Sequence, residues 1–544
     1  MSLGDGHRSG REAAAPIPGD VQTVAHLVEA RAVQHPHRCA LADSSRRLTY
    51  AELEVATARW ADALHAVGLR PGDRLGASMA NSVDLTLSHL GAMRAGLVWV
   101  GVSRASAPPE REHVLAHSGA ALLLVDDVPL DPPGDCPSMS VLAPEWARLL
   151  ADCPAVERPA IDPFAPAAIA FTSGTTGQPK GAVHSQRNML LPGVVARTNG
   201  DGHGIIGMYL PMTSLNMQVL GPVYALVNAT TCVCIDRRDA VSLAELIARE
   251  RIERVSASAA TVHDLVTDPA VTAEALSSLT ALTVGGSAAP EWLFDAYSRK
   301  FGRRFLAGYG LSEAPASVTR ERADRPHAAG GSGVALSQFQ LAVLDDRGRA
   351  VARGEVGEIC VRAAVDGPFA QVYTTMLGYW ADAAASALVV RDGWVRTGDI
   401  GRLGPDDELF VEDRRVDLIV RGGSNVYPAE VERVVLADPR VAGCAVVGRA
   451  HPRLGHVPIA LVQLRPGAVM TPDEVLAACA AALARYKVPV EARFVAELPR
   501  NPMGKILREP LRALVALAPD SAPAPAPDSA PAPVPTTDRG PVTD

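Results

Sequence analysis

The sequence has neither an excess of positive charge nor a set of paired cysteines. Its 544 residues carry a formal net charge of −8, which argues against binding to a nucleic-acid backbone. The eight cysteines are scattered, and only Cys232 and Cys234 stand close together, in the alternating pattern of a buried strand. The sequence therefore predicts no disulfide framework and no cysteine-based metal site, and it indicates a reducing cytoplasm.

Long apolar segments are missing as well. Residues 1–20 lack the apolar core of a signal peptide, and residues 517–544 are rich in Pro and Ala; we expect both ends to be disordered. Between Gly204 and Ile235 the chain has no charged residue, but prolines and polar residues interrupt this stretch. We expect a buried strand–helix–strand there and no membrane span.

Between the two ends, helical and strand patterns alternate. Apolar residues at spacings of three and four, among them Leu53 and Trp60, predict a helix that begins after Thr49 and ends at Val67-Gly68. Short apolar strands are predicted at 74–79, 122–125, 167–170, 232–235, 255–258 and 282–284. This alternation favours an α/β fold with parallel sheets. A smaller α+β region is predicted towards the C-terminus, with strands at 441–448 and 459–464 and helices at 428–437 and 472–485.

The clearest chemical signal is the segment 171–181, Phe-Thr-Ser-Gly-Thr-Thr-Gly-Gln-Pro-Lys-Gly. Its glycines allow a loop to turn backbone N–H groups inward and form an anion-binding concavity. Ser173, Thr175 and Thr176 add hydroxyl donors, and Lys180 adds a positive charge. The segment predicts a phosphate-binding loop, with a flexible surface loop as the alternative. It is not a Walker A loop, because glycine follows the lysine where Ser or Thr is required.

A second signal is the motif Gly308-Tyr309-Gly310-Leu311-Ser312-Glu313. Tyr309 offers an aromatic face to an adenine, Ser312 a hydroxyl group to a phosphate oxygen, and Glu313 a carboxylate oxygen to Mg²⁺. Upstream, Gly285-Gly286-Ser287 follows the strand predicted at 282–284 and would let a flat ring approach the backbone. Each of these motifs alone is also compatible with an ordinary turn.

Taken in chain order, these motifs resemble the signatures of the adenylate-forming superfamily, which comprises acyl-CoA synthetases, peptide-synthetase adenylation domains and firefly-type luciferases. Further matches are 393–399, 413–419, 421–430 and 498–508, and the resemblance covers roughly residues 22–515. It implies a large N-terminal domain, 21–413, of parallel-rich α/β sheets with a β-barrel-like subdomain. It also implies a small mobile α+β domain, 414–516.

The resemblance implies an ATP site in which Asp399 accepts hydrogen bonds from the ribose hydroxyls and Arg414 contacts ribose or phosphate. Lys505 would stabilise the charge that develops as a carboxylate attacks the α-phosphorus. The expected catalytic residues are Lys505, Glu313 and Ser312, with Glu313 as the metal ligand. The expected ATP-binding residues are Thr172, Ser173, Gly174, Thr175, Thr176, Gly177, Lys180, Gly286, Ser287, Tyr309, Gly310, Asp399 and Arg414.

By position, the resemblance also places an acyl pocket and a CoA path. Gly422 and Gly423 would leave room for the pantetheine arm. The expected pocket residues are Thr213, Ser214, Leu215, Met217, Val284 and Gly308. The sequence departs from the family pattern at Val416, where a hinge lysine or aspartate is usual, and at Asp413, where glycine is usual. A stiff apolar Val416 would alter the kinetics of domain rotation.

The expected reaction joins a carboxylic acid to CoA through an acyl-adenylate, uses ATP and Mg²⁺, and releases AMP and pyrophosphate. No aspartate lies between residues 202 and 235, which argues against amino-acid substrates. The apolar pocket favours a mainly apolar acid, with Asn216 or Gln218 available for one polar group. Transfer to a carrier protein's phosphopantetheine, a luciferase-like oxidase and a non-catalytic nucleotide-binding protein are the alternatives. The sequence leaves the oligomeric state open.

Overall fold

The computed structural model describes residues 21–516 except 107, 127–134, 173–178, 237–238, 287–288, 315, 346, 373–374, 415–416, 418, 422–423, 427, 452–453, 484 and 501–505. At residues 109, 172, 413, 414, 420, 424, 425 and 455 only the backbone is described. The predicted disordered ends, 1–20 and 517–544, lie outside these residues. Among the described helices, none combines the length and the apolar character needed to cross a lipid bilayer.

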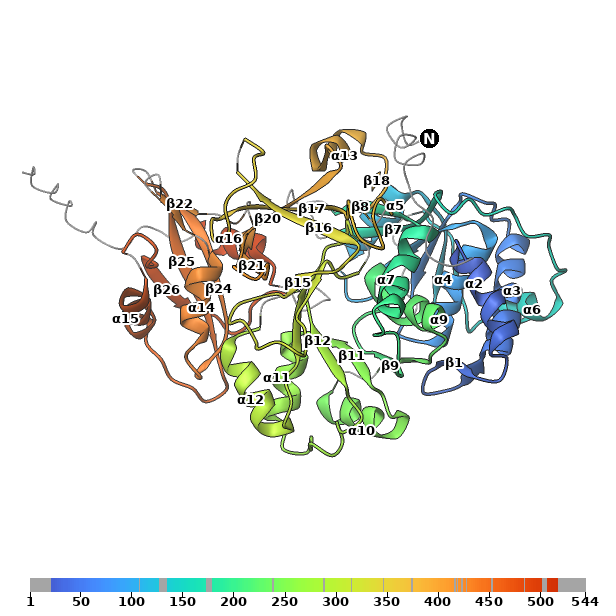
Figure 1. Ribbon diagram of the computed structural model, residues 1–544, viewed down its shortest axis with the longest axis horizontal. Helices are drawn as coiled ribbons and strands as arrows, with labels where there is room; N and C mark the ends of the chain where they lie inside the picture. The colour runs from blue at the N-terminus through green and yellow to red at the C-terminus, as the bar shows by residue number, and fades with distance from the viewer. Residues whose placement is uncertain are drawn as a thin grey trace, which may run out of the picture.

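A sheet with a parallel centre runs through the middle of the molecule (Figure 1). Within the described residues, its strand order is β15-β14-β13-β12-β11-β9-β10-β1-β2. Its strands are β1 Cys39–Ala42, β2 Arg47–Thr49, β9 Ile206–Met208, β10 Cys232–Cys234, β11 Arg254–Ala257, β12 Ala281–Val284, β13 Leu306–Tyr309, β14 Thr319–Arg320 and β15 Val334–Ala335. The neighbours from β1 to β13 in this order are parallel, and β2, β14 and β15 add antiparallel edges. We call it the first sheet.

The second sheet also has a parallel centre. Its order, over the residues that are described, is β18-β8-β7-β4-β3-β5-β6. Its strands are β3 Arg74–Ser78, β4 Val98–Gly101, β5 Ala120–Val125, β6 Ser138–Ser140, β7 Pro166–Thr172, β8 Lys180–Ser185 and β18 Gly378–Tyr379. β8 pairs antiparallel with β7 on one side and with β18 on the other. The short strand β18 therefore joins this sheet from a distant part of the chain.

Helices connect and cover these strands. They are α2 Val24–Gln34, α3 Tyr50–Ala66, α4 Val83–Ala95, α5 Pro108–Ser118, α6 Pro144–Asp152, α7 Gln186–Thr198, α8 Leu215–Gln218, the π-helical turn η2 Val219–Val223, α9 Tyr224–Asn228, α10 Ala240–Glu250, α11 Ala259–Thr267, α12 Glu291–Phe301 and α13 Ala383–Val389. One apolar core joins α2, α3, α4, α7 and α9 to the second sheet. Another joins α10, α11 and α12 to the first sheet.

Helix α3 shows how the local sequence sets an element. Thr49 and Glu52 form a capping box, in which the Thr49 N–H donates to Glu52 Oε2 at 2.8 Å and the Glu52 N–H donates to Thr49 Oγ1 at 3.2 Å. The helix ends before Val67, where Gly68 has a φ of +100°. Leu53 and Trp60 are buried on its inner face. The predicted start, end and apolar face of this helix are confirmed.

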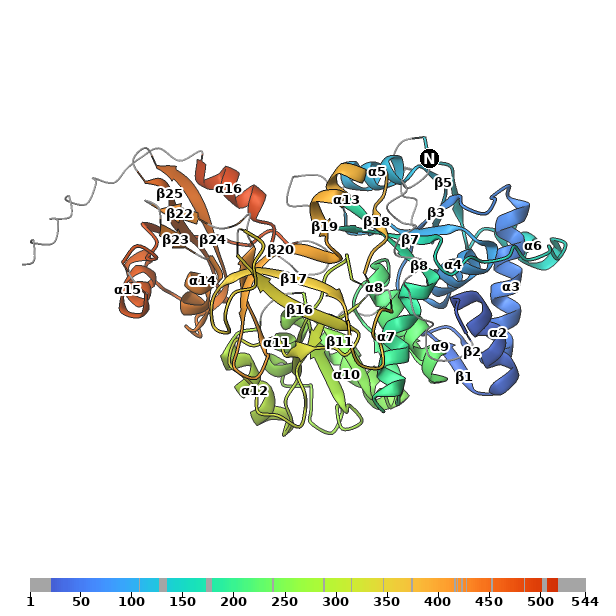
Figure 2. The ribbon, with the colours of Figure 1, turned by 45° about the horizontal axis from the view of Figure 1, so that its top comes forward.

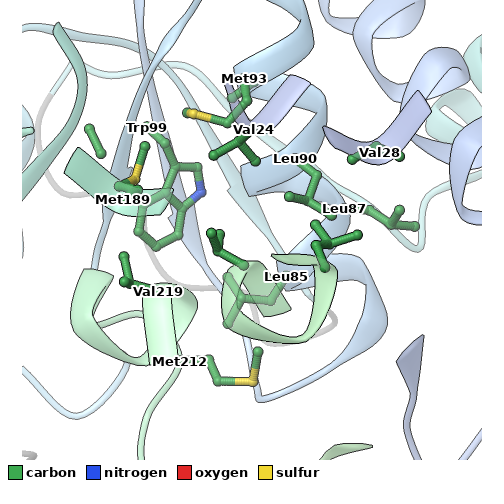
Figure 3. Packing of buried hydrophobic residues seen from close by; sticks show 14 of the residues in the cluster. Val24, Val28, Leu85, Leu87, Leu90, Met93, Trp99, Met189, Met212 and Val219 are labelled. Carbon is green, nitrogen blue, oxygen red and sulfur yellow. The ribbon is translucent and has the colours of Figure 1, made fainter. Parts of the chain in front are cut away.

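The uncharged stretch 204–235 forms a strand, a helical segment and a second strand: β9, then α8–η2–α9, then β10. The two strands are parallel neighbours in the first sheet, and the predicted strand–helix–strand is confirmed. In Figure 3, Met212 and Val219 from this stretch lie in the same apolar core as Trp99 of β4. A π-turn is often found at functional sites, and here it contains Pro222.

Two mainly antiparallel sheets follow in the rest of the chain (Figure 2). One, in the place of the predicted barrel-like subdomain, comprises β16 Phe339–Leu344, β17 Gly357–Ala363, β19 Val390–Arg391, β20 Trp394–Leu403 and β21 Leu409–Arg414. The C-terminal sheet comprises β22 Ile419–Arg421, β23 Ser424–Val426, β24 Val441–His451, β25 Gly455–Leu464 and β26 Glu491–Phe494, with β26 parallel to β25. Its helices are α14 Pro428–Leu436, α15 Pro472–Ala482 and α16 Arg508–Ala516. The chain thus has a large α/β part and a small α+β part, and the predicted fold class is confirmed.

Candidate active site

The predicted phosphate loop leaves and re-enters the second sheet at neighbouring strand ends. β7 and β8 pair antiparallel, and Thr172 at the end of β7 lies opposite Lys180 at the start of β8. The loop residues predicted to bind ATP lie outside the described residues, as does the side chain of Thr172; they are Ser173, Gly174, Thr175, Thr176 and Gly177. The structure thus fixes Lys180 where the loop returns to the sheet.

Lys180 and Glu313 both contact one tyrosine, Tyr379. The Lys180 Nζ is 5.5 Å from the centre of the Tyr379 ring, and the Tyr379 hydroxyl donates to Glu313 Oε1 at 2.6 Å. Burial raises the pKa of Tyr379, and the neighbouring Glu313 carboxylate raises it further. Tyr379 therefore stays a neutral donor that orients the carboxylate, while its ring faces the Lys180 ammonium group.

Tyr379 was not predicted from the sequence. It lies on β18, a two-residue strand opposite Ala182 of β8, nearly 200 positions away in the chain. No periodic pattern marks so short a strand. The available signal was the aromatic pair Tyr379-Trp380 directly after a glycine, between the phosphate loop and Asp399 in chain order.

Two predicted nucleotide-binding residues also meet. The Tyr309 hydroxyl, at the end of β13, donates to Asp399 Oδ2 of β20 at 2.6 Å. Asp399 is 6% exposed, and its N–H donates to Thr397 Oγ1 at 3.1 Å. Arg414 of β21 is its partner in the strand register, although the Arg414 side chain is not described. The structure thus brings Tyr309, Asp399 and the Arg414 backbone together, and their role in binding ATP stays a prediction.

Backbone crowding explains the glycines of the 308–313 motif. A Cβ atom on Gly310 would lie 2.5 Å from the carbonyl oxygen of Ala316, and one on Gly308 would lie 3.0 Å from that of Thr319. Ala316 itself has a φ of +72°, a left-handed conformation that is uncommon for a residue with a side chain. The segment therefore turns back sharply after Glu313.

His184 supports this turn from β8 and was also not predicted. Its Nε2 lies 2.7 Å from the carbonyl oxygen of Ser312, and because a carbonyl only accepts, this nitrogen carries the hydrogen. Burial lowers the pKa of His184 to about 4, so the ring is neutral at pH 7. His184 thus links the strand that begins with Lys180 to the segment that carries Glu313.

The predicted acyl-pocket residues come from the segment around α8 and from the first sheet. Thr213, Leu215 and Met217 are buried, and Ser214 is the N-cap residue of α8. A Cβ atom on Gly101 would lie 1.8 Å from the carbonyl oxygen of Thr213, so glycine at the end of β4 permits this contact. These pocket residues thus meet the second sheet.

Val284 and Gly308 lie on the first sheet instead. Val284 ends β12 and pairs with Ala307, next to Gly308. Gly286, two residues further on, has a φ of +82°, a conformation that glycine adopts without strain. The carboxyl ends of parallel strands are where open α/β sheets bind ligands.

Several predicted residues lie outside the described part of the chain. They are Ser287, Val416, Gly422, Gly423 and Lys505. Arg500 and Ile506, which flank residues 501–505 in the sequence, form an isolated antiparallel bridge. The roles predicted for the residues outside the described part of the chain stay predictions.

Similarity to known proteins decides the family. The profile of the AMP-binding enzymes matches residues 28–380, and the profile of the AMP-binding enzyme C-terminal domain matches residues 430–505. The chain belongs to the AMP-binding enzyme family. The resemblance of the motifs to the adenylate-forming superfamily is confirmed. Relatives that are CoA ligases show that the enzyme is an AMP-forming acid–thiol ligase.

Relatives with an assigned activity span nearly the whole chain. A feruloyl-CoA synthase from Amycolatopsis sp is 33% identical over 496 residues, 89% of this chain and 97% of the relative. The indoleacetate–CoA ligase of Aromatoleum aromaticum is 32% identical over 509 residues, 90% and 97% of the two chains. The fatty acid–[acyl-carrier-protein] ligase ScoC of Streptomyces coeruleorubidus is 29% identical over 521 residues, 90% and 96% of the two chains.

Solved structures agree with the fold. ATP-bound MatB from Rhodopseudomonas palustris superposes with a TM-score of 0.82 at 25% identity and covers 90% of this chain and 99% of its own. The amide bond synthetase McbA from Marinactinospora thermotolerans superposes with a TM-score of 0.80 at 27% identity, covering 90% and 99% of the two chains.

Proposed function

We propose that this ligase activates a mainly apolar carboxylic acid as its adenylate and transfers the acyl group to CoA at the site described above. The main support is that the segment 308–313 carries two contacts, Tyr309 with Asp399 and Glu313 with Tyr379. The first contact joins a ring and a carboxylate of the kinds that bind a nucleoside. The second joins a tyrosine to the carboxylate proposed to hold Mg²⁺, with Lys180 nearby as a cation for the phosphates. Their order along the segment follows the order of parts in MgATP.

Glu313 is the residue that would hold Mg²⁺. Mg²⁺ takes one or two protein carboxylates together with substrate phosphates, and a single carboxylate oriented by a neutral tyrosine fits that need. When bound, the ion neutralises negative charge on the phosphates. Lys180, whose ammonium group lies over the Tyr379 ring, adds a second positive charge.

Two steps complete the reaction. A carboxylate oxygen of the acid bonds to the α-phosphorus of ATP as the bond from that phosphorus to the bridging oxygen breaks and pyrophosphate leaves. The CoA thiolate then bonds to the acyl carbon, and the bond from that carbon to the AMP oxygen breaks. Most of the protein's contribution is positioning and charge stabilisation, and we assign the charge stabilisation of the first step to Lys505.

The role of Lys505 is tested by the variant Lys505→Ala. We expect adenylate formation to fall by about 100-fold or more, since one well-placed charged donor contributes about that much. The thiol step from a synthetic acyl-adenylate is expected to stay near the wild-type rate. Both half-reactions are measured separately by mass spectrometry of adenylate and thioester. An equal loss in both would contradict this assignment.

The acid is proposed from the helical segment that borders the pocket. Leu215 and Met217 are buried there, and Gln218 is fully buried with its Nε2 donating to the carbonyl oxygen of Met212 at 2.9 Å. Asn216 is only partly buried, which leaves it as the side chain better suited to one polar group. The activities of the relatives, on ferulate, indoleacetate and fatty acids, point to the same apolar class.

An acid panel with ATP, Mg²⁺ and CoA, analysed by mass spectrometry, tests the function itself. It includes hydroxycinnamates, arylacetates, succinylbenzoate-like diacids, fatty acids of several lengths and apolar amino acids. We expect acyl-CoA from apolar monocarboxylic acids and none from amino acids. Thioester from amino acids alone would contradict the proposed pocket.

A carrier protein is the second candidate acceptor, supported by the similarity to ScoC. Both acceptors present the same phosphopantetheine thiol. The same panel with holo-carrier protein in place of CoA distinguishes them: an adenylate that ignores CoA but loads the carrier would replace CoA in the proposal.

A further inference from the structure

Two histidines on α5 face the base of the predicted phosphate loop. His113 and His117 lie one helical turn apart, and their rings stack with centroids 5.4 Å apart and planes inclined by 19°. The Phe171 ring of β7 stands edge-on to both, with centroid distances of 6.5 Å to His113 and 5.9 Å to His117. Figure 2 shows α5 beside β18 and close to β7. The two histidines thus pack against β7, the strand that precedes the predicted phosphate loop.

Each histidine is hydrogen-bonded to a different backbone carbonyl. His113 Nε2 lies 3.0 Å from the carbonyl oxygen of Pro179, and His117 Nε2 lies 3.2 Å from that of Trp380. Since a carbonyl oxygen can only accept, both Nε2 atoms carry hydrogens and donate. Each ring therefore carries a hydrogen on Nε2, and together the two rings contact two separate segments of the chain.

The two carbonyls belong to residues next to the site. Pro179 directly precedes Lys180, and Trp380 directly follows Tyr379, over whose ring the Lys180 ammonium group lies. The β7–β8 register ends at the pair Thr172 and Lys180, so the Pro179 carbonyl lies beyond the ladder and His113 supplies a hydrogen bond there.

On the second segment, the Trp380 N–H donates to the carbonyl oxygen of Gly181 at 2.8 Å. With His117 on its own carbonyl, Trp380 is held on both sides, and β18 is held against β8. Lys180 and Tyr379 are therefore fixed relative to each other by backbone contacts that do not involve a nucleotide.

We infer that His113 and His117 are positioning residues for the triphosphate of ATP: they hold the returning end of the phosphate loop and strand β18 in register, so that Lys180 and Tyr379 keep their places. The inference rests on the proposed function, in which Lys180 and the Mg²⁺ held by Glu313 bind the phosphates of ATP. It predicts an effect on ligands with β- and γ-phosphates, with AMP unaffected, because the nucleoside contacts of Tyr309 and Asp399 lie on other strands.

The test compares variants that keep or remove the donor. His113→Gln and His117→Gln retain an N–H donor at similar reach, whereas His113→Met and His117→Met remove it at similar size. The dissociation constants of α,β-methylene-ATP with Mg²⁺ and of AMP are measured by titration calorimetry on the full chain. An exposed histidine, His37, is changed to Met as the control.

We expect each Met variant to weaken the ATP analogue about five- to tenfold, the effect of losing one hydrogen bond, with AMP binding unchanged. The Gln variants are expected to bind within about twofold of wild type. Unchanged analogue binding in both Met variants overturns the inference, and so does an equal loss for AMP, which would indicate general damage. If wild type binds neither ligand, the proposed function fails instead.

Discussion

At the scale of single residues, His327 bridges two carboxylates, Glu321 and Glu291. Through Glu321 it supports β13, the strand that ends at Tyr309. The Nδ1 of His327 lies 2.7 Å from Glu321 Oε1 and its Nε2 lies 3.1 Å from Glu291 Oε2, and its ring stacks on Phe294. Glu321 is 7% exposed and also accepts the Ala307 N–H of β13 at 2.7 Å. The hydrogen bond with Glu321 raises the pKa of His327.

This raised pKa predicts a pH-dependent contribution to stability. Protonation of His327 favours the folded state, so the contribution is complete below the ordinary histidine value of about 6.5 and is lost as the pH rises through the raised pKa. His327→Gln keeps donor and acceptor groups but cannot take up the charge. We expect it to lower the free energy of unfolding by about 1 kcal/mol at pH 6 and by much less at pH 9. Thermal midpoints at both pH values check this, and an equal loss at both would show that the charge contributes nothing.

At the scale of elements, Asn81 holds the acyl-pocket segment between β9 and α8. It lies between β3 and α4 and is 7% exposed. Its Nδ2 lies 3.2, 2.9 and 3.1 Å from the carbonyl oxygens of Met208, Leu210 and Ile235, which share its two hydrogens, and its Oδ1 accepts the Met212 N–H at 2.8 Å. This arrangement fixes the orientation of the amide, because only its nitrogen side can face carbonyls.

The substitution Asn81→Asp tests that arrangement. The carboxylate keeps the size and the acceptor but faces buried carbonyl oxygens without donors. We expect a loss of about 3 kcal/mol in unfolding free energy and a higher KM for the acid, with a smaller change in the KM for ATP. Asn199→Asp, at the exposed C-cap of α7, is the matched control. A stable variant with an unchanged acid KM would show that Asn81 does not set this segment.

The sequence allowed prediction of those features that depend on local chemistry. The capping box at Thr49 and Glu52 and the apolar face of α3 depend on residues within a few positions, and the motifs of the nucleotide site resemble a family in order and spacing. Tyr379 and the two histidines of α5 were missed because their roles come from pairing between strands distant in the chain. A two-residue strand has no period, and a histidine bound to a backbone carbonyl has no sequence partner to reveal it.

At the scale of the whole molecule, Arg465 connects the C-terminal region to the helices beside the first sheet. It follows β25, and its guanidinium group lies over the Trp292 ring of α12, 5.0 Å from the ring centre. Its Nη1 donates to His263 Nε2 of α11, while His263 Nδ1 lies 3.1 Å from Asp264 Oδ1. Because arginine always donates, His263 accepts at Nε2, and the proton is on Nδ1.

If the C-terminal region rotates between the two half-reactions, this contact favours one of its orientations. Removing the contact then changes the two steps unequally, whereas a purely structural contact would change both or neither. We expect Arg465→Met to change the ratio of the adenylation rate to the thioester-forming rate by at least about threefold, the effect of one cation–π contact with its hydrogen bond, and Arg465→Lys to change it less because the charge over Trp292 is kept. Single-turnover assays of each step measure the ratio. A ratio equal to wild type in Arg465→Met would mean that the contact of Arg465 with Trp292 and His263 does not bias the rotation.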